Sequence, residues 1–239
     1  MKKVLPLLAL ATLLAQTAQA GNLSSLGTLT QAELRTASED LGAALSYKPL
    51  LPTEDQGITG FDIGVAVTGT DVSRSAAALS KAGASLGSLD TLLTTRLNLH
   101  KGLPLGFDIG AFVASVPSLG TTVTGGELRY ALLKGGVATP AIGVRGALTR
   151  MSGSDQLALS TRSLDVSISK GFAMLTPYVG AGQVWVNSSP NAGSLAGESF
   201  NQGKLFAGAS MSLGLLNLTF EGDKTGNTTS WGVKLGLRW

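Results

Sequence analysis

Residues 60–67 read GFDIGVAV, and their apolar side chains recur at every second position. Ile63 and Val65 share one parity, whereas Asp62 falls on the other. Successive side chains of a strand point to opposite faces of a sheet, so strict alternation predicts a strand with one apolar and one polar face. GFDIG recurs at 106–110, which indicates a second strand of the same kind.

The alternation continues from there to the C-terminus in ten stretches, most of them about ten residues long. The connections are alternately short, as at 101–104, and longer or more polar, as at 72–89. Short turns on one side and longer loops on the other predict an all-β, antiparallel up-and-down barrel with both chain ends on the short-turn side. Closure removes the edges that an open sheet would expose.

The first twenty residues have a different layout. They combine two lysines, an apolar run that is short for a membrane span, and an A-x-A site ending at Ala20. This is the pattern of a secretory signal peptide. We therefore predict that residues 1–20 are removed by cleavage after Ala20 during export.

A helix is predicted between the signal peptide and the first strand. Residues 30–33 form a capping-box pattern, and apolar residues follow at helical spacing, which predicts a helix from about Gln31 to Ala44. Residues 21–56 would then be a helix and linker, in the periplasm or as a plug, and residues 57–239 the barrel. Residues 41–47 also fit a strand, which would favour twelve strands instead of ten.

The composition fits a barrel better than a soluble domain. Charged residues make up 14% of the 239 residues, against about 25% in typical soluble domains. The absence of cysteine excludes a disulfide framework. Without Lys2 and Lys3, basic residues outnumber acidic ones by only one, so the charge does not indicate a nucleic-acid partner.

The last ten residues, SWGVKLGLRW, carry the most specific pattern. One face of this final strand holds Trp231, Val233, Leu235, Leu237 and Trp239. Together with the export signal, this pattern resembles the Gram-negative outer-membrane β-barrel proteins. The resemblance implies an apolar exterior facing outer-membrane lipid, and a final strand that the barrel-assembly machinery recognises. A soluble periplasmic lipid-binding barrel, with its apolar face inward, is the alternative.

Aromatic residues should mark the two membrane interfaces of such a barrel. We expect Phe61, Phe107, Tyr178 and Trp239 at the periplasmic interface, and Trp185, Phe220 and Trp231 towards the other. The facing of residues 176–187 is not assigned, because both parities there carry apolar side chains.

The polar parity carries charges of both signs. The predicted lumen-lining residues are Asp62, Arg96, Asp108, Glu127, Arg129, Arg145, Asp165, Lys204, Glu221 and Lys234. These side chains either fill a structural barrel with ion pairs or set the selectivity of a narrow pore for small solutes. The Ala/Ser-rich and Gly/Ser-rich loops leave a third interpretation open, a surface adhesin or receptor.

Catalytic chemistry has little support in the sequence. Without cysteine and with a single histidine, thiol catalysis and multi-histidine metal sites are excluded. His100 is predicted to be a polar residue of the lumen or its rim. No phosphate-binding or metal-spacing motif is present, so we expect no enzyme activity, no cofactor and no metal.

Overall fold

The structure is a computed structural model that describes residues 21–136 and 138–239. Within these ranges ten strands form one closed antiparallel barrel, in which β1 pairs with β10. The predicted ten-stranded up-and-down barrel is thereby confirmed, and the twelve-stranded alternative is wrong. The predicted signal peptide, residues 1–20, lies outside the described residues.

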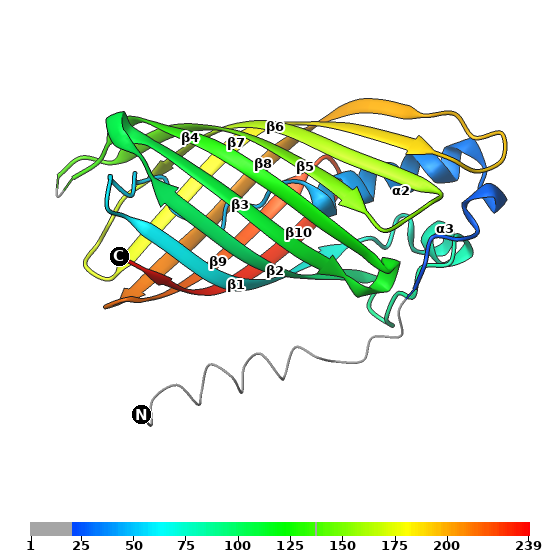
Figure 1. The fold of residues 1–239 in the computed structure, drawn as a ribbon, viewed down its shortest axis with the longest axis horizontal. Helices are drawn as coiled ribbons and strands as arrows, with labels where there is room; N and C mark the ends of the chain where they lie inside the picture. The colour runs from blue at the N-terminus through cyan, green and yellow to red at the C-terminus, as the bar shows by residue number, and fades with distance from the viewer. Residues whose placement is uncertain (1–20, 137) are drawn as a thin grey trace, which may run out of the picture.

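The elements follow one another with few long connections (Figure 1). The strands are β1 (Phe61–Asp71), β2 (Thr91–Gly102), β3 (Phe107–Val116), β4 (Thr121–Lys134), β5 (Ala141–Ser152), β6 (Leu157–Ser169), β7 (Leu175–Pro190), β8 (Glu198–Leu213), β9 (Leu216–Thr225) and β10 (Thr228–Arg238). The helices are α2 (Gln31–Leu45) and α3 (Ala76–Lys81), with 3-10 turns η1 (Leu26–Thr28), η2 (Pro104–Gly106) and η3 (Pro117–Leu119). Among the described residues, no helix has the length and apolar character needed to cross a membrane.

The barrel is apolar outside and polar inside. On β6, Leu164 and Val166 are 50% and 53% exposed, whereas Asp165 between them is 1% exposed. The same contrast recurs around the wall. A continuous apolar exterior of this extent suits lipid and not water. This facing is the reverse of a soluble lipid-binding barrel, so that alternative is wrong.

The two GFDIG copies begin β1 and β3, at the same end of the barrel with β2 between them. Their aspartates point inward but do not form a pair. Asp62 accepts a hydrogen bond from Lys234 at 2.8 Å, and Asp108 accepts one from Arg129 at 2.8 Å. The repeated motif therefore marks equivalent strands and not a shared site.

The segment before β1 lies inside the barrel. Helix α2 occupies the end with the long loops, and the chain then runs through the lumen to the short-turn end, where β1 begins (Figure 1). Gly21 donates a hydrogen bond to the Pro117 carbonyl in the β3–β4 link. The prediction that both chain ends lie on the short-turn side is therefore wrong for the N-terminal segment, which has already crossed the lumen before Phe61.

Helix α2 explains why the facing of residues 176–187 could not be assigned from the sequence. Val184 and Val186 on β7 point into the barrel, and they are fully buried because α2 packs against them. A Cβ on Gly42 of α2 would lie 2.6 Å from a methyl group of Val186, so only glycine permits this close approach. Tyr178 also points inward and donates a hydrogen bond to Glu221 at 2.7 Å, so its expected place at the lipid interface is wrong.

The short-turn rim does carry outward aromatic pairs. Phe61 stacks on Trp239 with ring centroids 5.0 Å apart, and Phe107 lies 4.7 Å from Tyr130. These pairs join β1 to β10 and β3 to β4 at their short-turn ends.

Candidate functional site: the occupied lumen

Residues 46–56 form an irregular segment with several bends inside the barrel and are the central feature of the lumen. Tyr47, Lys48, Leu50 and Leu51 are each no more than 2% exposed. An irregular chain in this position has backbone groups that neither a helix nor a strand satisfies, so the wall must supply their partners.

Charged wall side chains supply those partners. Arg129 donates from Nη1 to the Pro52 carbonyl at 2.6 Å, and Glu221 accepts from the Leu50 N–H at 2.9 Å. Lys204 donates to the Tyr47 carbonyl, and Asp108 accepts from the Gln56 N–H at 3.0 Å. Four of the ten predicted lumen-lining residues therefore bind the backbone of the inserted segment.

Lys48 anchors the segment to β9 and β10 through its ammonium group. Its Nζ lies 2.8 Å from Asp223 Oδ2 and donates to the Ser230 hydroxyl at 3.1 Å and the Ala43 carbonyl at 3.0 Å. Lys48 and Asp223 side chains are both 1% exposed. This pair was not predicted from the sequence, although Asp223 shares the inward parity of Glu221 and so could have been found.

His100 lies in a buried cluster that also includes the inserted segment. Its Nε2 is 3.1 Å from the Tyr47 hydroxyl and 3.5 Å from Glu127, and its Nδ1 is 3.5 Å from Asp62. The ring is 1% exposed. It is thus a polar residue of the lumen, and its contacts hold Tyr47 in place.

The remaining predicted lumen residues interact mainly with the wall itself. Arg145 lies 3.3 Å from Asp165 and 3.6 Å from Glu127. The Arg96 guanidinium lies 3.9 Å from the centre of the Phe112 ring, a cation–π contact. All ten predicted lumen-lining residues are buried inside the barrel, but their role in a pore stays a prediction.

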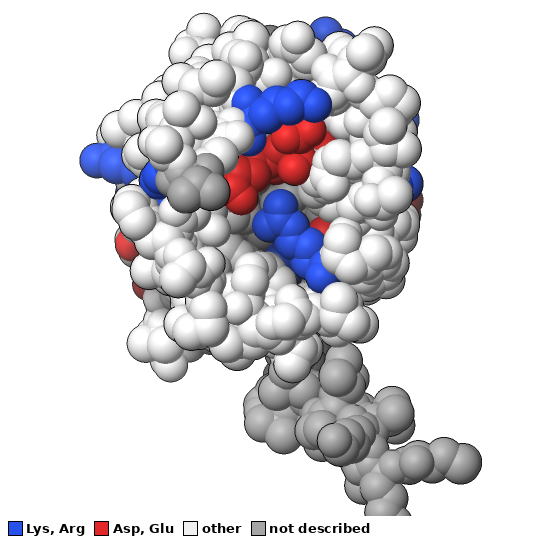
Figure 2. Space-filling view, turned by 90° about the vertical axis from the view of Figure 1, so that its left-hand side faces the viewer, with Lys and Arg blue, Asp and Glu red and all other residues white. Residues whose placement is uncertain are grey.

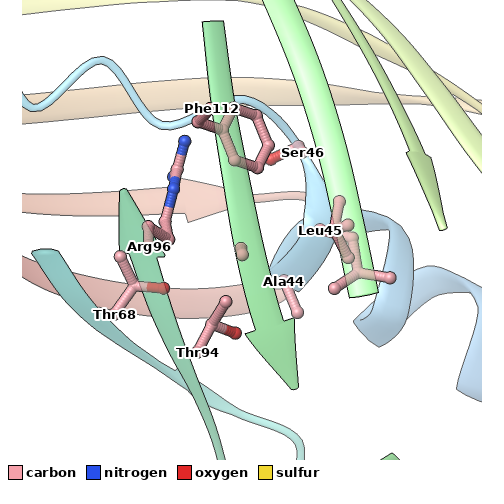
Figure 3. A pocket seen from close by; sticks show the side chains of 9 residues that line it. Ala44, Leu45, Ser46, Thr68, Thr94, Arg96 and Phe112 are labelled. Atoms are coloured by element: carbon pink, nitrogen blue, oxygen red, sulfur yellow. The ribbon is translucent and has the colours of Figure 1, made fainter. Parts of the chain in front are cut away.

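Little free volume remains beside α2. The pocket between the C-terminal turn of the helix and the wall, lined by Leu45, Ser46, Thr68, Arg96 and Phe112 among others, has a volume of about 10 Å³ (Figure 3). A cavity needs roughly this volume to hold one water molecule. The pocket has no room for a solute.

Charge pairs also lie at the short-turn mouth. Figure 2 views the barrel from this end and shows acidic side chains between basic ones in its hollow. Asp55, at the end of the inserted segment, lies 3.3 Å from Lys134 of β4, and the Glu54 carbonyl accepts from Arg129. The segment is therefore held at both ends as well as in the middle.

At the long-loop end, ion pairs join α2 to the loops around it. Glu39 pairs with Arg74 in the β1–β2 loop at 2.9 Å and with Arg35 at 3.0 Å. Arg35 also reaches Glu198 on β8 at 3.0 Å. Glu33 completes the capping box of α2 and pairs with Lys81 at 3.1 Å. No group of three or more potential metal-ligating His, Cys, Asp or Glu side chains is found in the described part of the chain.

Acid is expected to loosen α2 at its outer end. Burial raises the pKa of Glu39, but hydrogen bonds from Arg74 and Arg35 outweigh it and leave the pKa below the ordinary value of 4.5. A carboxyl with a lowered pKa stabilises the folded state above its ordinary pKa, and that contribution is lost as the pH falls through the lowered value. Protection of α2 against hydrogen exchange, corrected for the intrinsic exchange rate at each pH, should therefore fall below about pH 4.5. In Glu39→Gln the exchange should respond less to pH, and an unchanged response would contradict the assignment.

Several solved structures are similar to this chain at low sequence identity. The KdgM porin covers 74% of this chain and 98% of its own, at 11% identity and a TM-score of 0.38. The translocator domain of autotransporter NalP from Neisseria meningitidis covers 91% and 99%, at 11% identity and 0.37. Neisserial surface protein A covers 75% and 94%, at 13% identity and 0.30. No protein-family model and no curated protein matches the sequence.

With TM-scores below 0.5, these similarities support neither the fold nor a specific role. The closed ten-stranded sheet, the apolar exterior and the charged interior define the class, an outer-membrane β-barrel protein.

Proposed function

We propose that this protein is an outer-membrane barrel held closed by its own N-terminal segment, residues 21–56. One observation carries the proposal: residues 46–56 fill the lumen and are hydrogen-bonded to charged side chains of the wall. This supports the structural, non-conducting interpretation over a permanently open pore. Passage of small solutes would require the segment to leave the lumen.

The proposal includes the route to the membrane. Residues 1–20 direct export and are cleaved after Ala20, residues 21–56 become the plug, and residues 57–239 the barrel. The outward face of the final strand, from Trp231 to Trp239, is the recognition signal for the barrel-assembly machinery. We further infer a non-enzymatic role, because His100 is enclosed by Tyr47, Asp62 and Glu127 with no space for a substrate.

Planar-bilayer conductance tests whether the segment closes the barrel. The wild-type mature chain is expected to show no stable open state. In Gly42→Leu the new side chain must collide with Val186, so α2 should be displaced and channel openings should appear. Deleting residues 21–56 should give larger and longer openings. A heat-modifiability gel checks that each variant is folded.

Ala32→Leu is the matched control, because Ala32 lies on the exposed side of the same helix and its replacement should leave the barrel silent. Stable wild-type channels equal to those of Gly42→Leu would contradict the proposal. If folded barrels without residues 21–56 stay silent, the wall side chains alone close the lumen, and the plug is not the cause.

A further inference from the structure

Two arginines stand side by side on the lipid-facing surface of the barrel. Arg150 on β5 and Arg162 on β6 are exposed, and the residues on either side of each are buried. Arg150 is paired in register with Ser160, and Leu148 with Arg162. The arginines are therefore diagonal neighbours on one face, with Cα atoms about 7–8 Å apart by standard sheet geometry.

Neither arginine side chain has a hydrogen bond or an ion pair with any described residue. The outward positions of β4 to β7 in the described chain hold no Asp or Glu. This contrasts with Arg35 and Arg74 around α2, each of which has a carboxylate partner. Two unneutralised like charges on neighbouring strands repel each other, so an anion bound between them would stabilise the surface.

The pair lies at the loop-side edge of the apolar band. On β6, the outward residues towards the short-turn end are Leu164, Val166 and Ile168, and those beyond Arg162 towards the loops are Ser160 and Ala158. On β5, Leu148 precedes Arg150 and Ser152 follows it.

Trp185 on β7 marks the same level. It is the direct cross-strand neighbour of Arg162 and is 41% exposed on the outer surface. Tryptophan is enriched where acyl chains give way to headgroups. Arg150 and Arg162 thus sit at the height of lipid headgroups, on the side of the membrane that the long loops face.

We propose that Arg150 and Arg162 together bind the phosphate of an anionic lipid in the outer leaflet, whose acyl chains lie over Leu148 and Leu164. A planar guanidinium donates two parallel hydrogen bonds to a phosphate, and two such groups can hold one phosphate from both sides. The apolar residues directly below favour a lipid over a free phosphate ion. This site depends on the barrel lying in a membrane and is independent of whether the lumen is closed.

Native mass spectrometry of the folded, detergent-solubilised protein tests the site with phosphatidic acid and phosphatidylcholine as probes. The wild type should retain phosphatidic acid in preference to phosphatidylcholine. Arg150→Gln and Arg162→Gln should each weaken phosphatidic acid binding by about tenfold, the scale of one charge-assisted interaction. Arg150→Lys, which keeps the charge but loses the paired donors, should give an intermediate affinity.

Lys224→Gln is the matched control. Lys224 is an exposed outward cation on β9, three strands from Arg162 and without a second cation beside it, so wild-type binding is expected. Equal retention of the two lipids by the wild type would overturn the proposal, as would an equal loss in Lys224→Gln. Displacement of the lipid by inorganic phosphate at the same concentration would also overturn it, since the acyl chains would then contribute nothing.

Discussion

Replacing Lys48 with methionine is expected to destabilise the folded protein by about 3–5 kcal/mol, because it breaks a buried ion pair by removing one partner. The Lys48 ammonium contacts Asp223, Ser230 and the Ala43 carbonyl, and it is 1% exposed. In Lys48→Met the Asp223 carboxylate stays buried and charged, with the Thr225 hydroxyl as a remaining donor. Urea unfolding of the protein in lipid vesicles measures the change.

Two comparisons isolate the cause. In the double variant Lys48→Met/Asp223→Leu both charges are gone, so most of the lost stability should return. Lys81→Met removes a surface ion pair with Glu33, whose side chains are 44% and 36% exposed, and should change stability by only about 0–1 kcal/mol. If Lys48→Met is as mild as Lys81→Met, the inserted segment contributes little to the stability of the barrel.

The barrel could be predicted from the sequence because each strand of its wall has one face towards lipid and the other towards a polar lumen. Lipid outside and a polar lumen inside impose period two on each strand. Ile63 and Ile109 point outward in the two GFDIG copies, and Asp62 and Asp108 point inward. The alternation therefore predicted the strand count. The outward facing of the apolar side came from the resemblance carried by the final strand and the export signal, and closure came from the exposed edges that an open sheet would leave.

The facing of β7 could not be predicted, because its lumen side contacts an apolar helix surface instead of polar side chains. At Val184 and Val186 the lumen side of the wall is covered by α2, so inward positions are apolar too. Both parities then look alike, and periodicity cannot distinguish inside from outside. The facing of β7 was therefore ambiguous because a helix packs against it, and alternation alone does not identify that helix.

The inward-facing charged residues were predicted from the alternation of the strands, but alternation could not show what those residues bind. A charge that selects ions in a pore and one that binds a plug backbone occupy the same inward positions. What distinguishes them is the partner, and Lys48 is separated from Asp223 by 175 positions in the sequence. The sequence left the N-terminal segment either in the periplasm or as a plug for a related reason, since turn lengths indicate how strands are connected and not what lies inside the barrel.

Residues near Gly21 are expected to be accessible from outside the cell, whereas the short turns are not. The N-terminal segment crosses the lumen, and Gly21 lies among the long loops. The chain contains no cysteine, so a single introduced cysteine reports one position. A membrane-impermeant maleimide on intact cells should label Ser24→Cys and should not label Met174→Cys in the β6–β7 turn; both should react after permeabilisation.

Asp155→Cys, in the β5–β6 loop next to the N-terminal segment, is the control for surface exposure and should be labelled on intact cells. Ser24 and Asp155 are both exposed, so equal labelling is expected if the segment crosses the lumen in the cell. If Asp155→Cys reacts and Ser24→Cys is protected until permeabilisation, residues 21–56 remain on the periplasmic side and do not occupy the barrel. A barrel of opposite orientation would reverse the result for Met174→Cys and Asp155→Cys together, so the three positions separate an absent plug from an inverted barrel.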